Sequence, residues 1–330
     1  WEYSKNPLKP WRSVFQRFYL YLAIKTKLGP FLASYLIIIS PEISNAHNIL
    51  VIGGNNKIRV IDYKSKSVFV ILKKGFHRKY LEREITIRQN YGYLPVPSIK
   101  QLGKTDWYSE ELISGISPDR LNKESGNHVL LESTQKLHRL LTDTVIKDGL
   151  KKYTDEIILR IKNIIESMNR FDISQKRDIL EYVDSIASGL KKSSYFQSDN
   201  IYTAVTHGDF QSGNILFDGS KVWILDWEHS RRRQVGNDLF VLLLMPRYPV
   251  GFACRFLNMV DNQVDSIGKR LLSNWPYLNW KNDRNRKVML KLFVLEEIDF
   301  LLEENDNSLF YGQSFGLSPF FKELKKILEH

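Results

Sequence analysis

The sequence has almost no cysteine and no long uninterrupted apolar segment. Its one cysteine, Cys254, excludes an internal disulfide framework and a metal site built from several thiolates, and it is compatible with a reducing compartment. The longest apolar stretch near the start, 18–39, is interrupted by Lys25, Lys27 and a Gly-Pro pair, whereas a membrane-spanning helix needs about 20 mainly apolar residues. We therefore expect a cytoplasmic protein without a transmembrane helix.

The chain is also short of acidic residues relative to basic ones. Its 330 residues include 48 Lys and Arg against 37 Asp and Glu, which gives a formal net charge of +11. Such an excess favours an anionic partner, such as nucleotide phosphate, nucleic acid or a membrane surface. With 43% hydrophobic residues, the chain is large enough for one domain or two lobes with a core.

The first 40 residues combine six basic residues with several aromatic residues and a single acid. Two interpretations of this basic aromatic extension, 1–40, remain open. We favour an amphipathic helical extension whose apolar face packs on the main body. The alternative is a helix that lies on an anionic membrane, which would make the protein peripherally membrane-associated.

After this extension, the hydrophobic pattern predicts two lobes. Antiparallel hairpins are predicted by three short β-rich runs, 49–52, 58–61 and 68–72. A helix is expected over 80–89. Further helical patterns occupy 128–141, 155–168 and 176–190. We therefore predict an α+β fold, with a β-rich N-lobe over 41–113 and a mostly helical C-lobe over 114–330.

The stretch 207–228 contains two short apolar runs flanked by polar residues, 214–217 and 222–225. An Asp-Gly pair between the runs is a strong hairpin signal. In an antiparallel hairpin, Asn214 and Asp226 lie at the same open end, where an amide oxygen and a carboxylate could bind one cation. A few oxygen ligands suit Mg²⁺ when water and substrate phosphates complete its coordination.

Asp209 lies on the loop that leads into the same hairpin end. It could face the site without being a metal ligand, and it is then free to act as a base. Three other polar residues have structural interpretations that we favour: His207 braces the loop by bonding to a backbone carbonyl, Asp218 forms the turn, and Asp238 caps the following helix.

Two motifs in this stretch resemble those of a known family. His207–Asp209 followed by Asn214, and an apolar run that ends in Asp226–Glu228, resemble the HGDxxxxN and DWE motifs of the aminoglycoside phosphotransferase and choline kinase family, which is related to the protein kinases. The resemblance implies a protein-kinase-like two-lobe fold. It also implies that Asp209 is the catalytic base and that Asn214 and Asp226 hold Mg²⁺ against the phosphates of ATP.

The resemblance covers roughly residues 45–245 and favours a small acceptor. Gly208 stands where protein kinases carry an arginine, and Gln211 stands where protein serine/threonine kinases usually place a lysine. The implied activity is transfer of the ATP γ-phosphate to a hydroxyl of a small molecule, sugar or glycan. The alternatives are a choline-type or aminoglycoside kinase with a cationic acceptor, and a noncatalytic nucleotide-binding pseudokinase. A nucleic-acid-binding function would not explain the arrangement of polar residues at 207–228, so we expect no nucleic-acid partner.

The same resemblance implies a glycine turn over the phosphates, a lysine that binds them and an acid that holds this lysine. The candidates, in chain order, are Gly53 and Gly54 for the turn, Lys73 for the lysine and Glu84, on the following helix, for the acid. Lys74 is the alternative lysine and Glu82 the alternative acid.

Sequence features that bear on the acceptor point in two directions. Acids at helical spacing in 295–304 could receive a cationic substrate, and a solvated helix face explains them equally well. The net charge of +11 and the basic run 231–233 suit an anionic acceptor, such as a phosphorylated sugar or a cell-envelope glycan. We expect a sugar or glycan hydroxyl.

Overall fold

The computed structural model describes residues 48–103, 106–169, 171–192, 199–306 and 317–329. The predicted extension over 1–40, with its two interpretations, lies outside these residues. Among the helices of the described ranges, none is both long and apolar enough to cross a bilayer.

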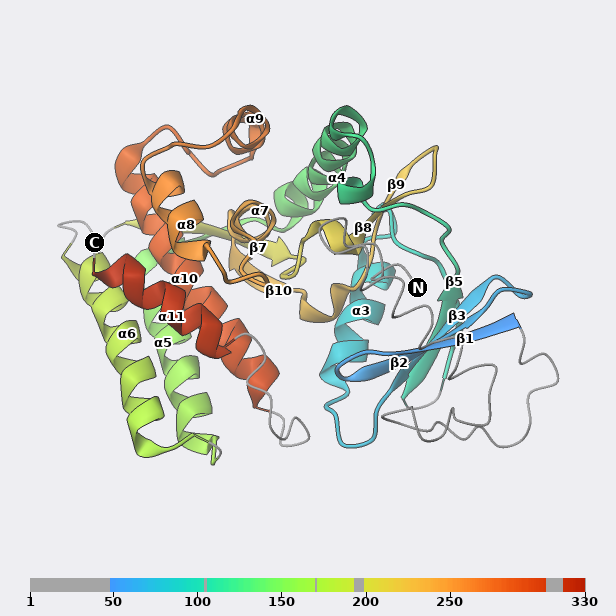
Figure 1. Ribbon diagram of the computed structural model, residues 1–330, viewed down its shortest axis with the longest axis horizontal. Helices are drawn as coiled ribbons and strands as arrows, with labels where there is room; N and C mark the ends of the chain where they lie inside the picture. The colour runs from blue at the N-terminus through green and yellow to red at the C-terminus, as the bar shows by residue number, and fades with distance from the viewer. Residues whose placement is uncertain (1–47, 104–105, 170, 193–198, 307–316, 330) are drawn as a thin grey trace, which may run out of the picture. The chain divides into compact units, whose positions relative to one another are not determined.

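A five-stranded sheet forms the first part of the described chain (Figure 1). Its strands are β1 (Ile49–Gly53), β2 (Lys57–Asp62), β3 (Ser67–Leu72), β4 (Ile99–Leu102) and β5 (Trp107–Glu111). They lie in the order β1-β2-β3-β5-β4, and β3 pairs antiparallel with both β2 and β5. The three predicted β-rich runs are confirmed as β1, β2 and β3. Val68, Val70 and Leu72 alternate along β3 and are buried, because successive strand residues face opposite sides of a sheet.

Helix α3 (Lys79–Asn90) follows β3 and packs on this sheet, as predicted for 80–89. Leu81, Glu84 and Ile87 are buried along it, since residues three or four apart share one helical face. Leu81 joins the small core that the sheet forms around Val70 and Tyr108. Glu84 therefore points into the lobe rather than toward solvent.

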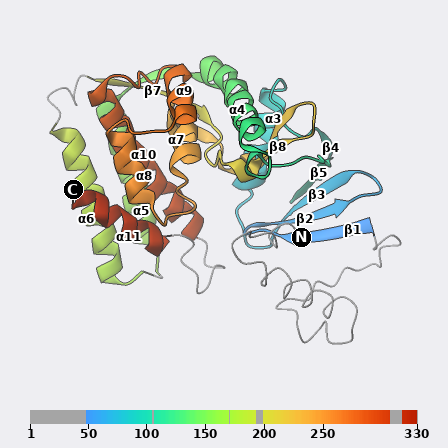
Figure 2. The same cartoon turned by 45° about the horizontal axis from the view of Figure 1, so that its top comes forward.

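The remainder of the described chain is mostly helical (Figure 2). Its helices are α4 (Lys123–Thr144), α5 (Leu150–Ser167), α6 (Ile173–Lys191), α7 (Asn237–Leu244), α8 (Phe252–Val260), α9 (Ser266–Asn274), α10 (Asp283–Asn305) and α11 (Leu317–Leu328). The three predicted helical patterns lie within or overlap α4, α5 and α6. Helix α10 carries buried residues on all sides and contacts α5, α6 and α8, as expected of a central core helix. A β-rich part followed by a helical part is the predicted two-lobe α+β fold.

Two small sheets in the helical part position the 207–228 stretch. The first has the order β10-β7-β6, with β6 (Ile146–Gly149), β7 (Asn200–Thr206) and β10 (Arg231–Gln234), and the sequence patterns did not predict it. The second is the hairpin of β8 (Ile215–Phe217) and β9 (Val222–Ile224). Because Thr206 pairs with Arg231, the two ends of the segment between β7 and β10 are fixed beside each other.

Candidate active site

The predicted hairpin is present, and it brings the two ends of the 214–226 segment together. β8 pairs antiparallel with β9, and the backbone N–H of Leu225 donates to the carbonyl of Asn214 over 2.8 Å. Asn214, just before β8, and Asp226, just after β9, therefore lie together at the open end of the hairpin. Asp218 has the predicted turn role, because its carboxylate accepts hydrogen bonds from the backbone N–H groups of Ser220 and Lys221.

His207 links the loop before the hairpin to the hairpin itself. Its Nδ1 accepts a hydrogen bond from the backbone N–H of Asp209 over 3.2 Å, and its Nε2 lies 2.7 Å from the carbonyl oxygen of Leu225. Because Nδ1 accepts this hydrogen bond, Nε2 is the ring nitrogen that donates to the carbonyl. This contact with a backbone carbonyl is the bracing role expected from the sequence.

Asp238 holds the same loop from the opposite side. Its two carboxylate oxygens accept hydrogen bonds from the backbone N–H groups of His207 and Gly208, each over 2.8 Å. The N-cap of α7 is Gly236, and no side chain caps this helix. The prediction that Asp238 is a helix cap is therefore wrong, because the tertiary fold supplies two loop donors to this buried carboxylate.

Gly208 is required by the shape of this loop. Its φ is +83°, a left-handed conformation that residues with a Cβ atom rarely adopt. An added Cβ would lie 2.3 Å from Nη1 of Arg233 and 2.5 Å from the carbonyl oxygen of His229. The backbone before Asp209 can therefore follow this path only with glycine.

The carboxylate of Asp209 is held on both of its oxygens. Oδ2 accepts hydrogen bonds from Nε2 of Gln211 and Nδ2 of Asn214, each over 3.0 Å. Oδ1 forms an ion pair with Nε of Arg247 over 2.8 Å. The side chain of Asp209 remains 15% exposed.

Lys57, on β2, forms the charged centre of the N-lobe side of the site. Its Nζ lies 3.0 Å from one carboxylate oxygen each of Glu84, Asp226 and Glu228. Two of these acids come from a segment about 170 residues further along the chain. A buried ammonium needs such partners, because an unpaired charge in the interior costs several kcal/mol.

The predicted lysine has a different position. Nζ of Lys73 donates to the backbone carbonyls of Gly54 and Asn55, over 2.6 and 3.1 Å, so it braces the glycine turn. The prediction that Lys73 pairs with Glu84 is therefore wrong, because β2 places Lys57 at the buried face of α3. The alternative Lys74 is exposed.

Glu84, rather than the alternative acid Glu82, is the helix residue that pairs with a strand lysine. Glu82 is exposed and forms an i,i+4 pair with Arg78. In the turn, neither Gly53 nor Gly54 has a positive φ, so the backbone conformation alone does not require glycine at either position. Their approach to phosphate stays a prediction.

Asp226 has a strained backbone and a strongly acidic side chain. Its φ of 63° and ψ of 60° are left-handed, which is uncommon for a residue other than glycine and is typical of functional sites. Burial by itself raises the pKa of this carboxyl, but Arg59, at 2.9 Å, and Lys57 outweigh burial and hold the pKa well below its usual range. Asp226 is therefore a carboxylate at any ordinary pH.

The residues present fit a Mg²⁺ ion. Nδ2 of Asn214 donates to Asp209, which turns Oδ1 of Asn214 away from that partner. Within the described ranges, neither this Oδ1 nor Oδ2 of Asp226 has a hydrogen-bond partner, so two oxygen donors are free at one hairpin end. Mg²⁺ commonly takes one or two protein oxygens and completes its octahedron with water and phosphate. The roles of Asn214 and Asp226 as ligands stay predictions.

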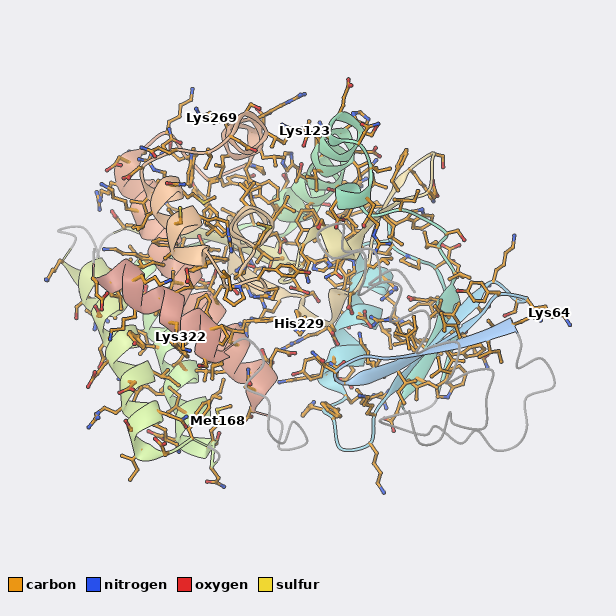
Figure 3. All side chains as sticks on the ribbon, viewed as in Figure 1. Lys64, Lys123, Met168, His229, Lys269 and Lys322 are labelled. Atoms are coloured by element: carbon orange, nitrogen blue, oxygen red, sulfur yellow. The ribbon has the colours of Figure 1, made fainter. Side chains whose placement is uncertain are left out.

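His229 joins the hairpin segment to α3 and α10. Its ring packs edge-on against Tyr80 and Phe300, and its nitrogens lie 3.5 and 3.6 Å from the carboxylates of Glu228 and Glu304. Figure 3 labels His229 among the side chains of the molecule. Burial by itself lowers the pKa of this imidazole, but the two acids outweigh burial and raise the pKa to about 9. His229 is therefore a cation at neutral pH.

The acids of 295–304 are neither a solvated helix face nor a set of unpaired carboxylates. Glu296, Glu297 and Asp299 are buried on α10, and each has partners inside the fold. Glu296 accepts hydrogen bonds from Tyr153 and Asn237, Glu297 from Arg247, and Asp299 from Arg160 and Arg231. A helix buried on all sides must neutralise its charges internally, so the solvated-face interpretation is wrong.

The basic run 231–233 is bonded within the fold, although Arg232 is exposed. Arg231 pairs with Asp299 and Glu303, Arg232 donates to the carbonyls of Thr144 and Thr203, and Arg233 donates to Thr206 and His229. These side chains hold β10 to its neighbours. They therefore no longer support an anionic acceptor.

Four charged residues of the site went unnoticed in the sequence. Lys57 and Arg59 alternate along β2 and so share one face, a signal that could have drawn attention to this strand. Arg247 lies in the turn after α7, and Glu297 lies on α10. No local pattern connects these two residues with Asp209, because only tertiary packing brings them there.

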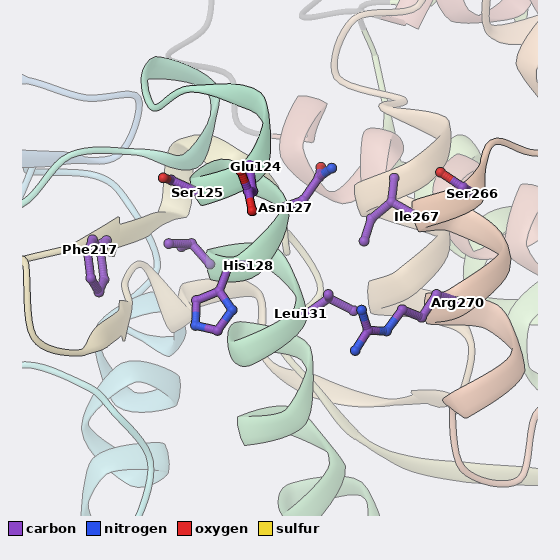
Figure 4. Close-up of a pocket in the computed structure, with 10 residues that line it drawn as sticks. Glu124, Ser125, Asn127, His128, Leu131, Phe217, Ser266, Ile267 and Arg270 are labelled. Atoms are coloured by element: carbon purple, nitrogen blue, oxygen red, sulfur yellow. The ribbon is translucent and has the colours of Figure 1, made fainter.

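A cavity of about 670 Å³ lies elsewhere, between α4, α9 and the β8–β9 hairpin (Figure 4). Its lining includes His128 on α4, Phe217 on β8 and Arg270 on α9. None of the predicted site residues lines it. The candidate active site is therefore the charged cluster around Asp209, Asp226 and Lys57, not this cavity.

These elements define a kinase-like class of fold: an antiparallel β-rich lobe with a buried lysine–glutamate pair, followed by a helical lobe that carries the hairpin site. No protein-family model and no curated protein sequence matches the chain.

Solved structures of kinases do match the fold. A choline/ethanolamine kinase family protein from Mesorhizobium loti is 15% identical, with a TM-score of 0.53 over 96% of this chain and 95% of that one. A choline kinase from Cryptosporidium parvum is 17% identical, with a TM-score of 0.50 over 87% and 91%. A thermostable mutant of the aminoglycoside phosphotransferase APH(4)-Ia, in complex with ADP and hygromycin B, is 12% identical, with a TM-score of 0.54 over 85% and 93%. The fold that the sequence resemblance implied is therefore confirmed.

Proposed function

We propose that the protein is an ATP- and Mg²⁺-dependent phosphotransferase that moves the γ-phosphate of ATP to a hydroxyl of a small molecule, sugar or glycan. The observation that carries this proposal is the Lys57 cluster, in which one buried ammonium touches Glu84 of α3 and Asp226 at the hairpin end. Structural relatives named as choline kinase and aminoglycoside phosphotransferase support the same chemistry.

In this proposal each side chain has a defined task. Lys57 and Arg59 bind the phosphates of ATP, Glu84 keeps Lys57 in place, and Asn214 and Asp226 hold Mg²⁺ through their free oxygens. The metal ion would neutralise charge on the phosphates as it develops. The remaining contribution comes from alignment of the acceptor with the γ-phosphate.

Asp209 is proposed as the base. Its carboxylate is oriented by Gln211 and Asn214, so it can hydrogen-bond an acceptor hydroxyl and take its proton as the new P–O bond forms and the bond between the γ-phosphorus and the β,γ-bridging oxygen breaks, releasing ADP. His207 and Asp238 support this task only indirectly, because they hold the backbone of the loop.

The test is ATP turnover with and without Mg²⁺, followed by a screen of sugars, choline and aminoglycosides with labelled ATP. We expect turnover that depends on Mg²⁺ and stops when a chelator is added. Binding of ATP without any turnover, in the presence of every acceptor of the screen, would instead identify the noncatalytic pseudokinase alternative. A cytoplasmic location and membrane contact through 1–40 remain part of the proposal, and cell fractionation tests them.

A further inference from the structure

Arg247 lies directly over the proposed base. Its Nε donates to Oδ1 of Asp209 over 2.8 Å, its Nη1 donates to Glu297, and its Nη2 donates to the carbonyl of Gly208 over 3.2 Å. The guanidinium also stacks on the ring of Phe300, 3.7 Å from the centroid. Four contacts from two segments, the loop at 208–209 and α10, therefore fix this side chain, so its position is defined rather than one of many surface rotamers.

The hydrogen bonds that Asp209 already makes leave one direction open for the hydroxyl of the phosphate acceptor. A carboxylate oxygen can accept about two hydrogen bonds. Oδ2 already accepts two, from Gln211 and Asn214, whereas within the described residues Oδ1 accepts only the one from Arg247. An acceptor hydroxyl that bonds to Asp209 therefore approaches Oδ1, next to the guanidinium.

Arg247 also occupies carboxylate oxygens of the two acids that could attract a cation. Glu297 is 2% exposed and has Arg247 as its ion-pair partner, and Asp209 shares the same guanidinium. Burial raises the pKa of Glu297, and Arg247 opposes that rise. A substrate ammonium at this point would meet the guanidinium of Arg247, which two carboxylates hold in place. Repulsion between the two positive charges would disfavour a cationic substrate.

The turn that carries Arg247 is itself fixed. Arg255 of α8 donates to the carbonyls of Leu244, Tyr248 and Val250, and so it holds the chain on both sides of Pro246 and Arg247. Arg231–Arg233 bond to other parts of the fold, whereas Arg247 lies beside Oδ1 of Asp209, where the hydroxyl end of the acceptor would bind.

We propose that Arg247 is a specificity-determining residue that selects an acceptor without positive charge near its reacting hydroxyl, namely an uncharged or anionic sugar. This inference rests on the proposed phosphotransferase function. The sugar class follows here from the partners of Asp209. In the sequence it was suggested by the basic run 231–233. A cationic group on the acceptor would have to displace Arg247 from both acids.

The experiment compares glucose, glucosamine and glucose 6-phosphate as acceptors, at a pH where the amine is protonated. ADP release gives kcat/KM for each sugar. The main variant is the double substitution Arg247→Met with Glu297→Gln, because Arg247→Met alone would leave a buried carboxylate without its cation. Arg247→Lys keeps the charge, and Arg177→Met, at a residue 66% exposed on α6, removes one surface charge as a matched control.

We expect the wild type, Arg247→Lys and Arg177→Met to prefer glucose and glucose 6-phosphate to glucosamine. In the double variant, the ratio of glucosamine to glucose kcat/KM should rise about tenfold or more. A wild type that prefers glucosamine, an unchanged ratio in the double variant, or no phosphorylation of any of these sugars by a protein that hydrolyses ATP would overturn the assignment. A wild type that shows no Mg²⁺-dependent ATP turnover would instead contradict the phosphotransferase function itself.

Discussion

Lys57 and Glu84 form a buried ion pair between β2 and α3, in which Nζ lies 3.0 Å from Oε2 and each side chain is 1% exposed. The hydroxyl of Tyr108 donates to the same glutamate oxygen over 2.7 Å. Burial lowers the pKa of the Lys57 ammonium, but Asp226, Glu228 and Glu84 outweigh burial and hold the pKa above its usual range. The ammonium therefore stays charged, and the pair connects the sheet, the helix and the hairpin end.

Lys57→Met should destabilise the fold and abolish activity, because Glu84, Asp226 and Glu228 lose the cation that they share. Removing one partner of a buried ion pair costs about 3–5 kcal/mol. The free energy of unfolding in denaturant measures this loss. Lys73→Met is the control, with an expected loss below about 1 kcal/mol and retained turnover. Equal effects of the two substitutions would contradict the assignment of Lys57.

Asp209→Asn should lower turnover by about 10² or more, because an amide cannot take the proton of the acceptor. Binding of ATP should stay nearly unchanged, since Lys57 and Asp226 are intact. Single-turnover kinetics and a separate nucleotide-binding titration measure the two quantities. Unchanged turnover would refute Asp209 as the base.

Gly208→Ala should reduce stability by more than the left-handed backbone alone explains. A left-handed conformation costs a residue with a Cβ about 1–2 kcal/mol. At Gly208 the new methyl group would also meet Arg233 and the carbonyl of His229, whereas at Gly219, with φ +97°, it meets open space. Thermal unfolding of Gly208→Ala and Gly219→Ala should therefore show the larger loss at 208, and the reverse order would count against this packing.

His229 should make stability depend on pH above neutrality. Its pKa is raised from 6.5 to about 9 in the folded protein, so its contribution is fully present below pH 6.5 and is lost as the pH rises through about 9. The groups that face it are Glu228 and Glu304, with Asp209 acting at longer range. The loss can reach about 3 kcal/mol.

The measurement is the unfolding free energy of the wild type and of His229→Gln across this pH range. Titration of groups that do not interact with His229 is common to both proteins and cancels in their difference, so what remains reports on His229 and its partners Glu228 and Glu304. The stability advantage of the wild type should shrink between pH 6.5 and about 9. A constant difference would show that His229 does not carry the charge.

Much of the site could be predicted because its signals are local. The Asp-Gly turn between two apolar runs is enough to place Asn214 and Asp226 at one hairpin end, since β-hairpin pairing is decided by neighbouring residues. Glu84 was a candidate through the family resemblance, and the structure places it between Leu81 and Ile87 on the buried face of α3.

Lys57 could not be distinguished from Lys73 in the same way. Both residues border strands of one hairpin, and Lys57 pairs in register with Leu72, immediately before Lys73. Which of the two amines enters the interior depends on how the sheet packs on α3 and on the hairpin end. Neither of these contacts is local in the sequence.

The sequence alone determined the order of β-rich and helical parts and the hairpin between 214 and 226, because short-range periodicity and turn residues specify such features. The tertiary structure decided which lysine meets Glu84, that Asp238 clamps the loop rather than capping a helix, and that Arg247 covers Asp209. These pairings join residues that are far apart in the chain. These pairings form because a buried charge without a partner is unfavourable, and packing decides which partners lie within reach.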